Sequence, residues 1–88
     1  MTYDWDEAKS RANKTKHGVG FQLMMQFNWG SAVIDVDDRH YDELREIADG
    51  FVGITLYHVV FTRRGEVIRV ISLRKSTKKE IIAYAQKL

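Results

Sequence analysis

The stretch GITLYHVVFTRRGEVIRVISLRK, residues 53–75, predicts two strands joined by a tight turn. Its first half, residues 53–62, alternates apolar side chains on both faces: Ile54, Leu56 and Val60 on one side, Tyr57, Val59 and Phe61 on the other. Apolar residues on both faces indicate a central strand that is covered, at least in part, on both sides. The Arg64-Gly65 pair turns the chain, and residues 67–73 return antiparallel.

Arginines recur at every fifth position of the second strand and its ends, at Arg64, Arg69 and Arg74. The guanidinium is always charged and its planar fork of donors fits a phosphate or a carboxylate. Period-two alternation places Arg69 on an apolar face and Arg74 on the other face. The apolar residues on the Arg69 face are Val67, Ile71 and Leu73. We therefore expect Arg64 and Arg74 to be accessible to solvent, whereas Arg69 either meets an external anion or pairs with a buried carboxylate such as Glu80.

The N-terminal third predicts a short edge strand followed by two helices. Residues 2–5 are the strand, Asp6 caps the first helix, and the helix ends at Lys16-His17-Gly18. Its thin apolar side consists of Ala8, Ala12 and Thr15. A second short helix fits residues 20–28, and its residues at core spacing are Phe21, Met24 and Met25.

The middle and the C-terminal end supply the remaining elements. Residues 32–36 predict a strand and residues 37–40 a turn; residues 41–48 fit a strand or a short helix, of which we favour the strand. Asp49-Gly50 is a hairpin-type turn signal. A capping box from Thr77 to Glu80 opens a last helix, whose apolar stripe is Ile81, Tyr84, Ala85 and Leu88. The expected fold is α+β: one domain, residues 1–88, with a small antiparallel sheet, two N-terminal helices and a C-terminal helix packed on it.

The composition narrows the functional classes. The chain has no Cys, so it forms no disulfide and no thiolate metal site. It shows neither a membrane-length apolar run nor a signal-peptide pattern, so we expect a cytoplasmic protein without a membrane partner. Net charge is +2, yet residues 62–88 carry eight basic and two acidic groups. Such a segment suits nucleic acid or an acidic protein, unless the acidic middle of the chain neutralises it.

Three motifs together resemble the BrnT toxins, the small toxin halves of type II toxin–antitoxin pairs. They are Trp5-Asp6-x-x-Lys9-x-x-x-Asn13-x-x-Lys16-His17-Gly18-Val19-x-Phe21, Asp38-x-His40, and Arg64-x4-Arg69-x-Ile71-Ser72-x-Arg74-x5-Glu80. The resemblance covers nearly the whole chain, although Phe61 stands where the family has Tyr. It implies a RelE-like fold and a ribonuclease that halts translation. It also implies a BrnA-like antitoxin with a ribbon-helix-helix segment, a heterotetrameric complex, and contact with operator DNA only through the antitoxin.

Metal-independent RNA cleavage uses the 2′-hydroxyl as nucleophile, a base to take its proton, and cations to stabilise the phosphorane. Arg64, Arg69 and Arg74 are the candidates for phosphate stabilisation. Lys16 and His17 are candidates to hold substrate or move protons, since imidazole titrates near neutrality; capping of the first helix is the other interpretation of His17. Further RNA-binding candidates are Lys9, Asn13, Ser72, Lys75 and Lys78.

The other candidate groups favour structural interpretations. His40 fits a surface turn, and His58 fits the core or a layer next to it. The aspartates of the middle segment, Asp35, Asp37, Asp38 and Asp42, lack the ligand spacing of a calcium loop. We therefore expect no metal and no cofactor. A non-catalytic nucleic-acid-binding domain or an antitoxin-docking domain remains the alternative to an enzyme.

Overall fold

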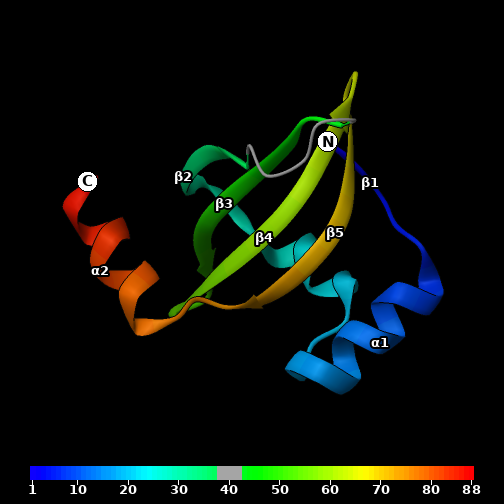
Figure 1. Cartoon of the computed structure of the whole chain (residues 1–88), viewed down its shortest axis with the longest axis horizontal. Coiled ribbons are helices and arrows are strands. Elements are labelled where there is room, and N and C mark those ends of the chain that lie inside the picture. Colours follow the sequence, from blue (N-terminus) through cyan, green and yellow to red (C-terminus); the bar gives the residue numbers. More distant parts are fainter. Residues whose placement is uncertain (38–42) are drawn as a thin grey trace.

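The computed structural model describes residues 1–37 and 43–88, which form a five-stranded sheet of order β1-β5-β4-β3-β2 (Figure 1). Four strands form an antiparallel meander: β2 (Asn28–Asp37), β3 (Arg45–Val52), β4 (Thr55–Arg64) and β5 (Val67–Lys75). β1 (Thr2–Asp4) pairs parallel with β5. The α+β class is confirmed, but the sheet is mixed, because the intervening helical segments carry the chain from one sheet edge to the other before β2 begins.

Two α-helices lie apart in Figure 1, with the sheet between them. α1 (Glu7–His17) begins where the Asp6 side chain accepts the Lys9 N–H and ends at Gly18, whose φ is 83°. α2 (Lys78–Gln86) begins with the predicted capping box of Thr77 and Glu80. The sequence therefore located both helix starts from their caps. Neither helix has the length and hydropathy needed to cross a membrane.

The predicted second N-terminal helix is a short 3₁₀ segment, η1 (Phe21–Gln26). The three-residue period of a 3₁₀ helix aligns Phe21, Met24 and Phe27, and all three are buried. Met25, expected in the core from α-helical spacing, is 66% exposed. The prediction of a second N-terminal α-helix was therefore wrong.

The core lies between one face of the sheet and the α1–η1 segment. Its buried residues are Phe21, Met24, Phe27, Ala48, Tyr57, Val59, Phe61, Ile68, Val70 and Leu73. α1 contacts this core with Ser10 and Asn13, whereas Ala8 and Ala12 of its predicted apolar side are exposed. The Asn13 amide donates to the carbonyls of Val19 (2.8 Å) and Leu73 (2.7 Å). Hydrogen bonds, not apolar contacts, therefore attach α1 to the sheet.

The β3–β4 hairpin turns later than predicted. Residues 49–50, read as a turn, lie inside β3, and the turn falls at Gly53, whose φ is 59°. Gly50 is needed within the strand because a Cβ there would lie 2.6 Å from Cζ of Phe27. The choice of strand is confirmed for residues 45–48, while the predicted turn beyond Asp37 lies outside the described residues.

A bulge in β5 changes which face its arginines occupy. Phe61 pairs with Val70 and Val60 with Ser72, so β5 carries one extra residue at Ile71. The bulge turns Leu73 toward the core, where it is fully buried. Arg74 therefore lies on the same side as Arg69, and the prediction of opposite faces was wrong. We call this side of the sheet, opposite the core, the outer face.

α2 covers one end of the outer face through Tyr84, which is buried and donates a hydrogen bond to the Ser31 carbonyl. Its ring also meets the Phe51 ring edge-on at 5.8 Å. The rest of the predicted stripe packs poorly, since Ile81 is 47% and Leu88 83% exposed. The C-terminal helix thus rests on the sheet by one aromatic residue and several polar contacts.

Candidate functional site

A pocket on the outer face gathers chemically active side chains from four strands. Its lining residues are Asp37, Arg45, His58, Val60, Ile71, Ser72 and Arg74, and we call it the outer-face pocket. Ser72 and Arg74 were expected from the sequence, whereas Arg45 and His58 were not. Two guanidinium groups, an imidazole and a hydroxyl, together with the Asp37 carboxylate, surround one hollow, and the set can bind an anion and transfer a proton.

Arg74 is fixed by a two-pronged ion pair with Glu80. Its Nη1 lies 2.7 Å from Oε1 and its Nη2 2.9 Å from Oε2 of that carboxylate. The hydrogen bonds from Arg74, helped by the Thr77 N–H and by His58, lower the pKa of Glu80 to about 2. The same hydrogen bonds raise the pKa of Arg74. Both groups are therefore charged at any physiological pH, and the guanidinium is held in one orientation.

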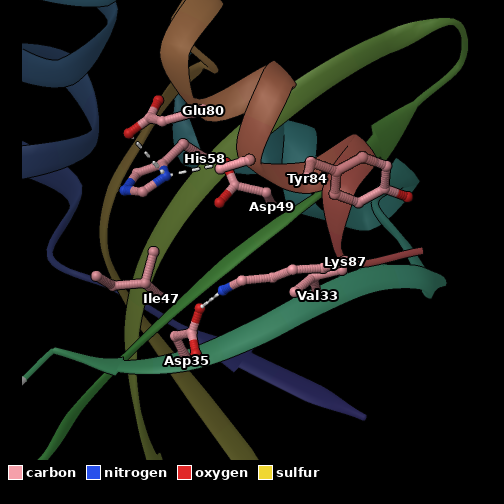
Figure 2. A pocket seen from close by; sticks show the side chains of 9 residues that line it. Val33, Asp35, Ile47, Asp49, His58, Glu80, Tyr84 and Lys87 are labelled. Carbon is pink, nitrogen blue, oxygen red and sulfur yellow. Dashed lines mark hydrogen bonds and ion pairs between the residues drawn. The ribbon is translucent and has the colours of Figure 1, made fainter.

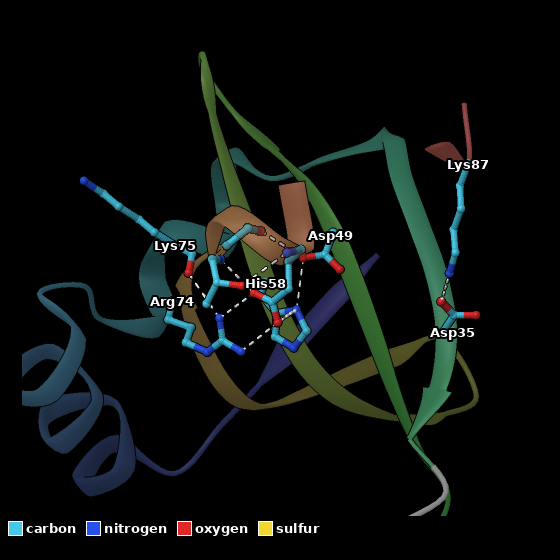
Figure 3. Close-up of polar contacts among 9 residues, drawn as sticks. Asp35, Asp49, His58, Arg74, Lys75 and Lys87 are labelled. Carbon is cyan, nitrogen blue, oxygen red and sulfur yellow. Dashed lines mark hydrogen bonds and ion pairs between the residues drawn. The ribbon is translucent and has the colours of Figure 1, made fainter. Parts of the chain in front are cut away.

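His58 lies directly opposite Arg74 in the β4–β5 pairing. Its Nδ1 is 3.0 Å from Oδ1 of Asp49 and 3.3 Å from Oε2 of Glu80 (Figure 2). Ser76 donates its hydroxyl hydrogen to the same Asp49 oxygen at 2.9 Å, which completes the network drawn in Figure 3. Two carboxylates beside Nδ1 favour the tautomer with hydrogen on that atom. Nε2, without a partner among the described residues, then offers a lone pair.

Arg45 supplies the second guanidinium of the outer-face pocket. Its backbone lies opposite Asp37 in the β2–β3 register, and its side-chain Nε is buried without a hydrogen-bond partner in the described part of the chain. A buried donor without an acceptor is costly. An anion bound in the pocket would provide the acceptor that Arg45 lacks.

The other two predicted arginines lie outside the pocket. Arg69 pairs with the exposed Asp4 of β1, so the carboxylate that it meets is neither buried nor Glu80, the example considered from the sequence. Arg64 is 76% exposed, with Nη2 3.8 Å from Oε1 of Glu43. Since a strand rises about 3.3 Å per residue, Arg69 and Arg74 are roughly 15 Å apart along β5. A single phosphate cannot contact the whole row.

The predicted residues of α1 do not line the outer-face pocket either. Lys9 and Lys16 are exposed and His17 is half-buried. Asn13 is buried, and its amide group is occupied by Val19 and both backbone groups of Leu73. Its position thus corresponds to a role in the fold, with no amide atom left for RNA. Lys75 and Lys78, in contrast, are exposed where β5 leads into α2.

Asp49, His58 and Glu80 are also the best-placed group for a metal ion among the described residues. One ligand atom from each lies within 4.8 Å of the others. The aspartates of the middle segment do not belong to this group: Asp35 pairs with Lys87, Asp37 lines the outer-face pocket, and residues 38 and 42 lie outside the described part. Because the Arg74 guanidinium already neutralises Glu80, a cation would have to displace it. Arg74 therefore competes with a cation for the Glu80 carboxylate.

Arg45, Asp49 and His58 were not predicted as site residues, because the sequence around each of them indicates such a role only weakly. Arg45, Ile47 and Asp49 alternate along the chain and therefore lie on the same side of a strand. Extending the predicted strand beyond residue 48 would have placed Arg45 on the outer face. Asp49 was assigned to a turn, because Asp-Gly is a typical hairpin-turn sequence. His58 was interpreted as structural because it stands between apolar neighbours, although an imidazole beside a charged residue on the next strand can serve either role.

A family model described as "Ribonuclease toxin, BrnT, of type II toxin-antitoxin system" matches residues 5–80. The matched span includes every residue of the outer-face pocket and ends at Glu80. No curated protein matches the chain.

Proposed function

The chain belongs to the BrnT family of ribonuclease toxins of type II toxin–antitoxin systems, and from this premise we propose that the outer-face pocket is its RNA-cleaving site. Family membership also gives the protein a cognate antitoxin as its partner. The observation that carries the proposal is the juxtaposition of an imidazole with a free Nε2 and a fixed guanidinium on neighbouring strands.

The scissile phosphate binds between Arg74 and Arg45. Arg74 keeps its charge and direction through Glu80, so it needs no reorganisation when negative charge develops on the phosphorane. Arg45 gains the acceptor that its buried Nε lacks. The Ser72 hydroxyl, in the same pocket, donates to a phosphate oxygen or to the ribose.

His58 acts as the base. Nε2 takes the proton of the 2′-hydroxyl while that oxygen attacks the adjacent phosphorus and the 5′-oxygen leaves, protonated from solvent. The products are a 2′,3′-cyclic phosphate and a 5′-hydroxyl end. Asp49 and Glu80, close to Nδ1, hold the tautomer and stabilise the imidazolium that forms. His17 on α1 is the competing candidate for this role.

The reaction needs no metal in this proposal, because arginines supply the positive charge. The direct test is cleavage of naked single-stranded RNA by purified toxin, free of antitoxin, in excess EDTA. We expect full activity and cyclic-phosphate ends. If EDTA abolished cleavage and a divalent ion restored it, the Asp49–His58–Glu80 group would be a metal site and the arginine mechanism would fail.

The remaining cations guide RNA toward the pocket. Lys75 and Lys78 are exposed just beyond Arg74, while Arg64, Arg69, Lys9 and Lys16 lie farther away and contribute weaker, salt-dependent contacts. Affinity for RNA that falls steeply with salt, without any cleavage, would support the alternative of a non-catalytic binder.

The biological setting follows from the same premise. We propose that cleavage inhibits translation in the cytoplasm and that the fold is a RelE-like variant. The antitoxin is BrnA-like, with a ribbon-helix-helix segment, and forms a heterotetramer that contacts operator DNA only through the antitoxin. Hydrolysis of messenger RNA in a translating extract, followed by mass measurement of the toxin–antitoxin complex, tests both parts.

A further inference from the structure

An apolar groove lies between α2 and the β3–β4 hairpin. Its lining residues are Phe51, Ile54, Leu56, Ile81, Tyr84, Ala85 and Leu88. Ile54 at the hairpin tip is 98% exposed and Leu88 at the end of the chain 83%. Contiguous apolar surface of this kind in a water-exposed protein marks an interaction site.

The fold makes little use of three of these apolar side chains, Ile54, Ile81 and Leu88. α2 is fastened by the Tyr84 hydroxyl on the Ser31 carbonyl and by ion pairs from Glu80 and Lys87. Ile81 and Leu88 contribute less to this attachment, because 47% of Ile81 and 83% of Leu88 remain exposed. α2 is held on its sheet mainly by polar contacts, and its exposed apolar residues face the groove. These residues are therefore available to contact a partner.

The first turn of α2 carries two lysines without ion-pair partners among the described residues, and one of them, Lys78, lies on the groove side of the helix. Lys78 precedes Ile81 by three residues and Ala85 by seven, so all three lie on one stripe of α2. Lys78 and Lys79 form no ion pair with any described residue, and both oppose the helix dipole in the first turn. A carboxylate from a partner would supply the missing ion pair and would offset the unfavourable interaction with the helix dipole.

The strand arrangement restricts how a partner can bind here. β3 and β4 are interior strands, so the hairpin beside the groove offers no free edge for an added strand. Recognition must therefore come from side chains that enter the groove. We propose that the groove is the docking site for a segment of the cognate antitoxin that presents apolar anchors and, next to them, a carboxylate for Lys78.

Docking here also explains how inhibition reaches the active site, a consequence that rests on the proposed function. Glu80, which orients Arg74, belongs to the same helix as Ile81, and Lys78 stands beside the proposed RNA path. An antitoxin segment along α2 therefore competes with RNA for Lys78 without entering the outer-face pocket. The docking surface and the catalytic pocket have no lining residue in common, and Glu80 and Ile81 connect them as neighbouring positions of α2.

The test compares two double variants in binding to the purified product of the adjacent antitoxin gene. Ile54→Ser with Ile81→Ser removes two anchors of the groove. Met25→Ser with Leu44→Ser is the matched control, since Met25 and Leu44 are exposed apolar residues, 66% and 68%, outside the groove. The measurements are the dissociation constant by calorimetry, the melting temperature, and RNA cleavage by each toxin alone.

We expect the groove variant to lose about 100-fold in antitoxin affinity, as removal of two interface anchors does, while the control keeps wild-type affinity. Both should keep the wild-type melting temperature and RNA cleavage. Binding of the groove variant within about tenfold of wild type would overturn the proposal. So would a toxin that is dimeric alone and becomes monomeric in the groove variant, because a second copy would then be the occupant. Absence of cleavage by every toxin, with the affinity loss intact, would refute the proposed pocket but not the docking site.

Discussion

Arg74 and Glu80 form a two-pronged ion pair that joins the end of β5 to the first turn of α2, with N–O distances of 2.7 and 2.9 Å. The same carboxylate accepts the Thr77 N–H at 2.8 Å and lies 3.3 Å from Nδ1 of His58. One acidic side chain thus caps a helix, fixes a guanidinium and approaches an imidazole. A substitution at Glu80 is consequently expected to affect both the stability of the fold and the proposed RNA cleavage.

The first prediction concerns the stability of Glu80→Gln as a function of pH. In the folded protein the pKa of Glu80 falls from 4.5 to about 2. Ionised Glu80 therefore stabilises the fold above about pH 4.5, and this contribution is lost as pH falls through about 2. At neutral pH the free energy of unfolding of the variant should be about 2 kcal/mol lower than that of wild type, which corresponds to a melting temperature roughly 10 °C lower. Urea titrations should show the difference shrinking toward pH 2; a constant difference would contradict the ion-pair explanation.

The second prediction separates two histidines. In His58→Asn, the amide N–H₂ can still donate to Asp49, but no base remains at the Nε2 position. RNA cleavage should fall about 100-fold or more, the usual range for loss of a general base, with little change in melting temperature. His17→Asn is the matched control on α1 and should retain activity. Loss of activity only in the His17 variant would move the site to α1.

The sequence was informative wherever a local rule determined the structure. The caps at Asp6, Gly18 and Thr77 and the alternation of β4 depend on neighbouring residues alone, and the structure confirms them. The β5 bulge was not predictable in this way, because it appears only when β5 is aligned with β4. One extra residue reversed the side assigned to Arg74.

The candidate site was only partly predictable for the same reason. Arg74 and Ser72 were identified from the basic C-terminal stretch, and both line the pocket. Asp49 and His58 are nine residues apart in sequence and meet only because β3 and β4 pair. The ion pairs of Arg69 with Asp4 and of Arg74 with Glu80 were not predictable in detail, since single-sequence patterns do not reveal which carboxylate each arginine meets.

The third prediction assigns Asn13 to the fold. Its side chain makes three hydrogen bonds, two to Leu73 and one to Val19, at distances of 2.7 to 3.3 Å. Asn13→Ala would leave buried backbone groups without partners, so we expect a loss of about 3 kcal/mol in unfolding free energy. At a temperature where the variant is folded, verified by circular dichroism, its KM for RNA should equal that of wild type. A raised KM with unchanged stability would show instead that Asn13 binds RNA.

The last prediction tests whether one arginine or the whole row acts on the phosphate. Arg74→Lys keeps the charge but cannot form two parallel hydrogen bonds, so both the Glu80 pairing and the phosphate orientation are lost. Its kcat should fall about 100-fold, as for removal of one oriented donor to a developing negative charge. Arg69→Lys is the control: it pairs with Asp4 outside the pocket, and it should change kcat by less than about threefold. Single-turnover cleavage of a short RNA measures both. Equal losses in the two variants would mean that the arginines along β5 bind one extended anion together, and the outer-face pocket would not be the catalytic centre.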